Sequence, residues 1–274
     1  MLQESNKELT EAIKENKPFI ASRIWMGPET NATILYLDKR FKFCNFPNAG
    51  IYSKKKEDIK LFYENNLECL KNSKFLCCFD NSFSPIEKKL LEHFNLTKLK
   101  SRILEPFYAC LEELEPWSLH LFGKKVLIIN PFVDSFQKQL KNNFRFFKDK
   151  IIFHPEQEFV FYKTYQTSAG NHIHSSWVET FELMKEGIRK LDFDIALLGC
   201  GGYGLSLCNF IKMELGKSAI YVGGGLQLLF GVKGRRWETH PIIKKLIDEN
   251  GTFISPSGDE VMKNKDKIEN GCYW

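Results

Sequence analysis

A glycine-rich turn between an apolar run and a helix-like segment constrains the fold of this chain more than any other feature. The turn spans residues 199–204, reads GCGGYG and fits the pattern GxGxxG; the apolar run 193–198 precedes it and the helix-like segment 205–215 follows. A short apolar run bounded by glycine indicates a buried strand, and a strand followed directly by a helix indicates a crossover to a parallel neighbour. The sequence therefore predicts a parallel sheet with helices packed against it.

Other segments repeat this alternation of strand and helix. Strands are expected at 18–25, 75–79, 124–132, 151–153, 193–198 and 218–222. Helices are expected at 6–15, 30–37, 56–72, 134–148, 177–190 and 205–215, with a further one opening at Ser84-Pro85. This order predicts the α/β class, a Rossmann-like and mainly parallel sheet flanked by helices, with a helix-rich N-terminal half. Repeats and obvious linkers are absent from the sequence, so one domain over 1–274 is expected.

Composition excludes several classes of protein. Of the 274 residues 43% are hydrophobic and 27% charged, as in ordinary globular proteins. The sequence has no apolar run of about 18 residues, so no transmembrane segment is expected. A polar N-terminus without the apolar stretch of a signal peptide predicts a cytoplasmic protein. Eight cysteines without CxxC spacing are expected to be buried, reduced thiols.

The net charge of +5 is mild and spread along the chain, which argues against nucleic acid as a partner. Two basic stretches stand out, 54–56 and 233–236. Only the second adjoins glycines. Its cations, Lys233, Arg235 and Arg236, are candidates for binding a diphosphate, because arginine can bind phosphate oxygens bidentately. An exposed basic loop without a ligand is the alternative.

The glycine turn has a physical reason to bind phosphate. Glycine lets the backbone approach a ligand closely, and the N-terminus of the following helix presents unpaired N–H groups and positive potential. The candidate donor-binding residues of this turn are Gly199, Gly201, Gly202, Tyr203 and Gly204. A packing turn without a ligand remains open, since one GxGxxG is a weak signal.

The second glycine run, 223–225, ends the neighbouring predicted strand where an NAD enzyme would carry an acidic residue for the ribose. The missing acid weakens the interpretation as a reductase. Gly223 and Gly224 are instead expected beside the first turn, at the carboxyl edge of the sheet.

Charged side chains follow two other predicted strands. Arg23 and Glu29 follow the first strand; Arg23 is a candidate donor-binding residue and Glu29 a candidate general base or metal ligand. Asp134 follows the strand 124–132 and is the second candidate catalytic carboxylate. A helix-start role for Glu29 is equally compatible with the spacing. His172 and His174 are expected to have a structural or acceptor-side role, because two histidines alone make a poor metal site.

These segments together resemble the GT-D-type glycosyltransferases, and more closely an uncharacterised relative from bacterial and viral surface-polysaccharide loci. The likeness rests on 126–132, 199–207, 223–237 and 271–274. The family carries an Arg-Phe-Gly-Asp-Gly-Glu element linked to metal and donor sugar. Arg23 and Glu29 match its first and last residues, but Gly27 stands in place of the Asp, which puts a Mn²⁺ or Mg²⁺ requirement in doubt.

The resemblance implies a glycosyltransferase of surface glycan or polysaccharide biosynthesis, with a nucleotide-sugar donor and a glycan or lipid-linked acceptor as partners. A non-catalytic nucleotide-binding or scaffold protein of the same pathway is one alternative. A Rossmann-like methyltransferase or reductase is another.

Overall fold

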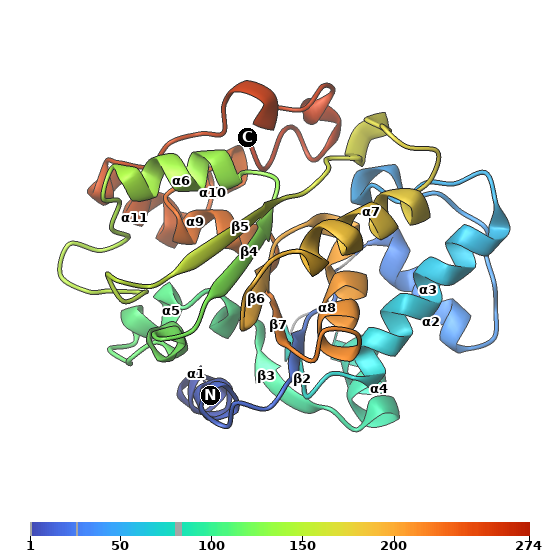
Figure 1. Ribbon diagram of the computed structural model, residues 1–274, viewed down its shortest axis with the longest axis horizontal. Helices are drawn as coiled ribbons and strands as arrows, with labels where there is room; N and C mark the ends of the chain where they lie inside the picture. The colour runs from blue at the N-terminus through green and yellow to red at the C-terminus, as the bar shows by residue number, and fades with distance from the viewer. Residues whose placement is uncertain (1, 26, 80–83) are drawn as a thin grey trace.

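The computed structural model describes residues 2–25, 27–79 and 84–274, which form one seven-stranded sheet flanked by helices (Figure 1). The strand order is β3-β2-β1-β7-β6-β4-β5, and every neighbouring pair is parallel. The strands are β1 (Ile20–Ser22), β2 (Phe75–Cys78), β3 (Thr97–Lys100), β4 (Val126–Asn130), β5 (Phe159–Lys163), β6 (Ile195–Leu198) and β7 (Ser218–Tyr221). The predicted α/β class with a Rossmann-like parallel sheet is confirmed.

Helices cover both faces of this sheet (Figure 1). Their bounds are α1 (Leu2–Lys14), α2 (Pro28–Leu37), α3 (Lys56–Lys71), α4 (Ser84–Phe94), α5 (Phe107–Leu111), α6 (Val133–Lys141), α7 (Trp177–Arg189), α8 (Gly204–Met213), α9 (Leu226–Leu229), α10 (Arg235–Glu238) and α11 (Pro241–Asn250). One core contains side chains of α1, α5, α6, α9 and α11, and the other contains side chains of α3, α7 and α8. None of the helices in the described part of the chain has the length and apolar character that a bilayer span requires.

Strand β4 shows why the central strands read as unbroken apolar runs. Val126 and Ile128 belong to one core, while Leu127 and Ile129 belong to the other. Successive side chains of a strand point to opposite faces, so a strand covered by helices on both sides needs apolar residues at every position. The expected strand at 124–132 is confirmed by this packing.

The order of the strands creates a switch point between β4 and β6. The chain leaves β4 toward β5 on one side and leaves β6 toward β7 on the other. Connections that diverge from neighbouring parallel strands leave a crevice at their carboxyl ends, where ligands bind in open α/β sheets.

One sequence-based expectation about the edge of the sheet is wrong, because residues 151–153 form no strand. Strand β4 pairs with β6 on one side and on the other with β5, which the sequence analysis did not anticipate. Strand β5 begins with four consecutive apolar residues, 159–162, a run of the kind that indicates a strand, so the sequence carried a signal that was overlooked. Strand β3, at the opposite edge, was also not anticipated.

The helix expected at 134–148 is shorter than predicted. It ends at Lys141, because Asn143 adopts a positive φ of 54°, a conformation that asparagine tolerates and a helix interior does not. The following residues Phe144, Phe146 and Phe147 pack against the core that contains α6 instead of extending the helix.

Candidate functional site

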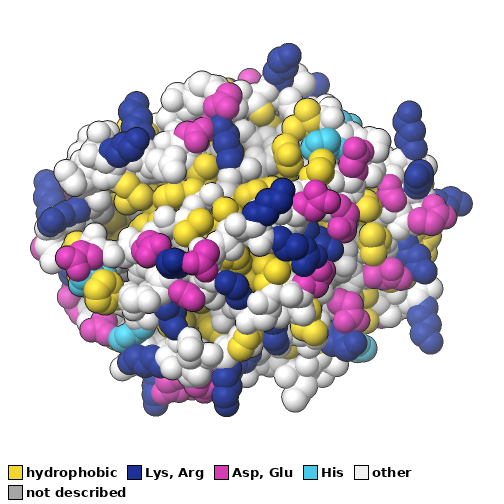
Figure 2. All heavy atoms as spheres, in the orientation of Figure 1, with side chains coloured by type: hydrophobic (Ala, Val, Ile, Leu, Met, Phe, Trp, Pro, Cys, Tyr) yellow, Lys and Arg dark blue, Asp and Glu magenta, His cyan; other side chains and the backbone are white. Residues whose placement is uncertain are grey.

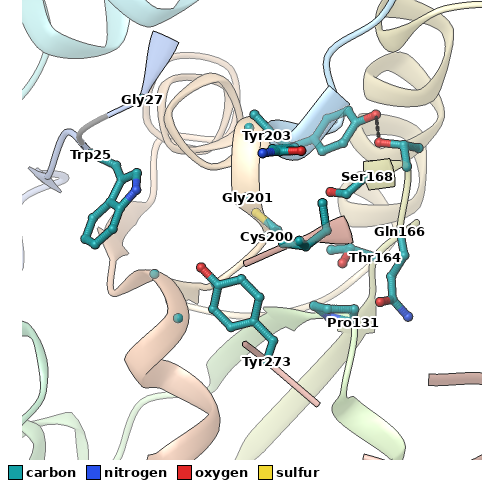
Figure 3. Close-up of a pocket in the computed structure, with 18 of the residues that line it drawn as sticks. Trp25, Gly27, Pro131, Thr164, Gln166, Ser168, Cys200, Gly201, Tyr203 and Tyr273 are labelled. Carbon is teal, nitrogen blue, oxygen red and sulfur yellow. Dashed lines mark hydrogen bonds between the residues drawn. The ribbon is translucent and has the colours of Figure 1, made fainter. Parts of the chain in front are cut away.

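A cavity of about 340 Å³ opens at the carboxyl edge of the sheet (Figure 3). Its walls come from the segments that follow β1, β4, β5, β6 and β7, together with residues of the segment 258–274, here called the cover segment. The predicted residues that line it are Arg23, Glu29, Gly199, Gly201, Gly202, Tyr203, Gly223 and Gly224. The expectation that these segments meet at one sheet edge is confirmed, whereas their roles toward a ligand stay predictions.

The two glycine turns touch each other at the floor of the cavity. A Cβ atom on Gly199 would lie 2.6 Å from the carbonyl oxygen of Gly223 and 2.8 Å from Nδ2 of Asn130. Asn130 donates from that nitrogen to the carbonyl oxygen of Gly199 at 2.7 Å. Gly199 is therefore required for the close approach of two backbone segments, and Asn130 at the end of β4 fixes the turn.

Protein packing accounts for two further glycines of the turn. A Cβ on Gly202 would lie 2.6 Å from the carbonyl oxygen of Ala49, and one on Gly204 would lie 2.3 Å from the ring of Tyr221. Gly201 differs, because its φ is +56° and the nearest atom to an added Cβ is 3.8 Å away. The open stretch of the turn is thus Cys200-Gly201, which Figure 3 shows facing the cavity.

The turn leads into α8 through a short 3₁₀ segment, Gly201–Tyr203. The first N–H groups of a helix have no partner within it, so this end carries positive potential beside the cavity.

At the N-terminus of α6, by contrast, a side chain of the protein binds the free N–H groups. The carboxylate of Glu260, 1% exposed, accepts hydrogen bonds from the amides of Asp134 at 2.9 Å and Ser135 at 3.1 Å. Sequence reasoning missed Glu260, which lies 126 residues from Asp134.

Arg23 lies between the cavity and a buried carboxylate. It lines the cavity and donates to the carbonyl oxygen of Val222 at 2.7 Å, while its guanidinium lies 3.8 Å from Glu105. Burial raises the pKa of Glu105 to about 7, against the lowering effect of Arg23 and Arg102. Gly225 makes room for this carboxylate, since a Cβ there would lie 2.2 Å from Glu105 Oε1. No feature of the sequence marked Glu105 as a residue near the site.

Glu29 presents a carboxylate at the cavity wall from the first turn of α2. Burial raises its pKa above the usual value. Within the described part of the chain, its side chain has no ion-pair partner. The side chain folds back over Gly27, where an added Cβ would lie 2.1 Å from Oε1. A side chain at position 27 would therefore require the carboxylate of Glu29 to move.

Asp134, the other candidate carboxylate, does not line the cavity. Its Oδ2 lies 2.5 Å from Nζ of Lys163, and Lys163 also lies 2.8 Å from Asp259. The side chain of Asp134 is exposed at the start of α6. These contacts join α6, β5 and the cover segment beside the cavity rather than within it.

The basic residues 233–236 also lie outside the cavity wall, and 235–238 form the short helix α10 rather than a loop. Lys233 lies 3.4 Å from Glu238, and Arg235 donates to the carbonyl oxygen of Asn270 at 3.3 Å. Arg236 lies 2.5 Å from Glu269 and donates to the hydroxyl of Tyr273 at 3.1 Å. These cations therefore contact acidic and polar groups of the protein.

Arg236 contacts residues that line the cavity, although it does not line the cavity itself. Glu269 and Tyr273 both line the cavity, and the guanidinium of Arg236 lies 4.6 Å from the centre of the Tyr273 ring. It also lies 5.5 Å from the ring centre of Trp25, which lines the cavity as well (Figure 3). Arg236 thereby links the cover segment to the segment after β1.

Uncharged hydrogen-bonding side chains form much of the remaining wall. Thr164, Gln166 and Ser168 follow β5 along one side of the cavity (Figure 3), and Asn48 comes from the turn between α2 and α3. Among the described residues, the side chains of Asn48, Thr164 and Ser168 have no hydrogen-bond partner. They are free to bind hydroxyl groups of a ligand.

The described residues do not provide a Mn²⁺ or Mg²⁺ site of the kind the resemblance implies. They contain no group of three or more His, Cys, Asp or Glu side chains that could hold a metal ion. Gly27 leaves Glu29 as one carboxylate where the family pattern has two.

The histidines and cysteines have the structural environments expected from the sequence. His172 stacks on Tyr52 with ring centres 3.6 Å apart, and His174 Nδ1 lies 3.0 Å from the hydroxyl of Thr180. All eight cysteines are free and seven are buried. Cys200 lines the cavity, and burial raises the pKa of its thiol well above the usual range.

Comparison of this chain with protein-family models, with curated proteins and with solved structures found no match.

Proposed function

We propose that this protein is a nucleotide-sugar-dependent glycosyltransferase that acts in the cytoplasm on a glycan or lipid-linked acceptor of surface-polysaccharide biosynthesis. The observation that carries the proposal is the composition of the cavity. One wall combines the glycine turn, the N-terminus of α8 and Arg23, which suit a diphosphate. Another wall presents uncharged amide and hydroxyl side chains, which suit a sugar.

The donor would bind with its diphosphate against Cys200-Gly201 and its sugar toward Asn48, Thr164 and Ser168. Backbone N–H groups and a helix dipole stabilise the charge that develops on a diphosphate leaving group. Arg23 adds a fixed cation, because its contact with Val222 holds it beside the second glycine turn.

Glu29 is the proposed general base. Its carboxylate accepts the proton of an acceptor hydroxyl while the acceptor oxygen bonds to the anomeric carbon of the donor. The bond from that carbon to the diphosphate oxygen breaks, and the diphosphate leaves with the electron pair. A carboxylate whose pKa is raised by burial binds a proton more readily, which suits this role. The proposed mechanism uses no step at a metal ion.

The packing contacts of Gly202 and Gly204 favour a second candidate, a nucleotide-binding or scaffold protein without catalytic activity. The Rossmann-like methyltransferase or reductase is the third candidate carried from the sequence. The three differ in which ligand the cavity binds and whether that ligand is consumed.

The test is a thermal-shift screen of the whole chain with nucleotide sugars, S-adenosylmethionine and NAD, followed by an assay of donor hydrolysis. Stabilisation by a nucleotide sugar with hydrolysis supports the proposal. Stabilisation without hydrolysis or transfer supports the binding protein, and stabilisation by S-adenosylmethionine or NAD alone contradicts both. Asp134→Asn is the matched control for Glu29→Gln, because Asp134 lies outside the cavity wall.

A further inference from the structure

The segment 38–58, here called the basic hairpin, joins α2 to α3, includes the first residues of α3, and concentrates the positive charge of the chain. It has six cationic and three acidic residues, a net charge of +3 within a chain of net charge +5. The cations are Lys39, Arg40, Lys42, Lys54, Lys55 and Lys56, and the acids are Asp38, Glu57 and Asp58. The proposed function uses none of these residues.

The segment folds back on itself between its two basic stretches. Phe46 and Ile51 form an antiparallel bridge, in which Phe46 N donates to the Ile51 carbonyl oxygen at 2.8 Å. The amide of Ser53 donates to the side-chain oxygen of Asn45 at 2.9 Å. The turn of the hairpin carries Asn48 at the cavity wall, and both basic stretches lie away from that turn. The first stretch runs along α3, where the Tyr63 hydroxyl donates to the carbonyl oxygen of Lys42 at 2.9 Å.

Two phenylalanines alternate with the cations of the first stretch. Phe41 is 43% exposed and Phe43 is 41% exposed, beside the exposed side chains of Arg40 and Lys42. Both rings are therefore partly open to solvent beside exposed cations. The same combination of basic and aromatic side chains is found on protein surfaces that rest at a membrane interface.

Most of the charge on the hairpin is available to a partner. Within the described part of the chain, five of its lysines have no ion-pair partner: Lys39, Lys42, Lys54, Lys55 and Lys56. Arg40 lies 3.5 Å from Asp38, which also lies 2.6 Å from Lys89, and Asp58 accepts from the Ser53 hydroxyl at 2.6 Å. Figure 2 shows basic side chains projecting from the margin of the molecule where α2 and α3 lie in Figure 1.

We propose that the basic hairpin docks this protein on an anionic lipid surface. Its lysines face the lipid phosphates and Phe43 enters the headgroup region, while Phe41 remains packed against Tyr36 and Tyr63. Lysine near an anionic leaflet and an aromatic ring in the interface both favour binding. A single-stranded nucleic acid fits this surface less well, because it binds in a basic groove that follows its backbone. The cations described here are confined to one hairpin. The inference does not depend on the proposed function.

The experiment is co-sedimentation of the whole chain with vesicles of two compositions. One consists of phosphatidylcholine alone, and the other of equal parts phosphatidylcholine and phosphatidylglycerol. We expect binding to the mixed vesicles, little binding to phosphatidylcholine, and weaker binding as salt increases.

Two variants test the residues of the hairpin. Lys54→Gln/Lys55→Gln/Lys56→Gln should lower the partition coefficient by at least about 10-fold, since each surface lysine contributes separately. Phe43→Ser should lower it severalfold. Phe43 is preferred to Phe41, because the Phe41 ring packs 6.2 Å from Tyr36 and 6.1 Å from Tyr63, so its loss would also disturb the fold.

Matched controls change the same residue types elsewhere. Lys138→Gln/Lys244→Gln/Lys245→Gln removes three cations from α6 and α11, and Phe122→Ser removes an aromatic side chain that is 49% exposed. Both controls should bind the mixed vesicles like the wild type. An equal loss in the controls, or no binding of folded wild-type protein to mixed vesicles, overturns the proposal. Binding to single-stranded nucleic acid but not to vesicles also overturns it.

Discussion

The carboxylate of Glu29 lies directly above the α-carbon of Gly27. A Cβ atom at position 27 would lie 2.1 Å from Oε1 and 2.3 Å from Cδ of Glu29, so any larger residue would displace the carboxylate. A side chain at position 27 and the observed place of the Glu29 carboxylate therefore exclude each other unless the Glu29 side chain turns away.

The first prediction concerns that carboxylate. Glu29→Gln should lower turnover by about 10²–10⁴-fold, because the amide cannot accept the acceptor proton, while donor affinity stays nearly constant. Initial rates and calorimetric titration of the donor measure the two effects. Asp134→Asn is expected to retain turnover. Full turnover in Glu29→Gln would leave Glu29 as a helix-start residue only.

The second prediction concerns pH and Glu105. The pKa of Glu105 is about 7 in the folded protein against 4.5 ordinarily, so the folded state binds the proton more tightly. The free energy of unfolding should therefore fall as pH rises from about 4.5 to 7, by up to about 1.4 kcal/mol per unit of pKa difference. Urea unfolding across this range measures it.

Glu105→Gln should flatten this dependence between pH 4.5 and 7, since the amide does not titrate. Glu249→Gln, an exposed glutamate on α11, should leave it unchanged. The same slope in both variants would mean that Glu105 titrates normally in the folded protein.

The third prediction concerns the glycine turn. Gly202→Val should destabilise the fold by about 1–3 kcal/mol, because its side chain meets the backbone of Ala49 and the side chain of Ile51. Gly123→Ala is the comparison, since Gly123 also lies in a turn but has no atom within 4 Å of an added Cβ. Its φ of +85° adds only backbone strain, of about 1 kcal/mol. Thermal unfolding that ranks Gly123→Ala as the more damaging change would contradict the packing role.

The fourth prediction separates two neighbouring arginines. Arg236→Ala should loosen the cover segment, because Arg236 contacts both Glu269 and Tyr273. The expected result is faster proteolysis within 258–274 and weaker donor binding. Arg235→Ala removes a single side-chain bond to Asn270 and should change both less. Equal proteolysis of the two variants would show that Arg236 does not hold the segment.

The sequence predicted the centre of this molecule better than its edges. Strands β4 and β6 are covered on both faces, so their burial appears as continuous apolar runs in the sequence. The edge strand β3, which reads TKLK, has one buried residue and lacks that signal, whereas the apolar run 159–162 of the other edge strand, β5, was overlooked. The glycine turns were predicted to be neighbours from the rule for parallel sheets, and the contact of Gly199 with Gly223 agrees.

The parts of the site that depend on distant pairs were not predicted. The partners Arg23 and Glu105 lie 82 positions apart, and Glu260 fills a helix end 126 positions away. Neither carboxylate belongs to a local motif, and both acquire their role only when the sheet brings separate segments together. The basic residues 233–236 were recognised as distinctive, but their acidic partner Glu269 was not.

The bond from Arg23 to Val222 joins positions that are 199 residues apart. Strand β1 pairs with β7 as well as with β2, so the cavity forms only after strands from the two ends of the chain have paired. Chains with many such distant contacts fold slowly. A partly folded chain in which β1 and β7 have not paired would lack the binding site. Ligand affinity and global stability are therefore thermodynamically linked: a compound that fills this cavity must raise the unfolding temperature of the entire sheet.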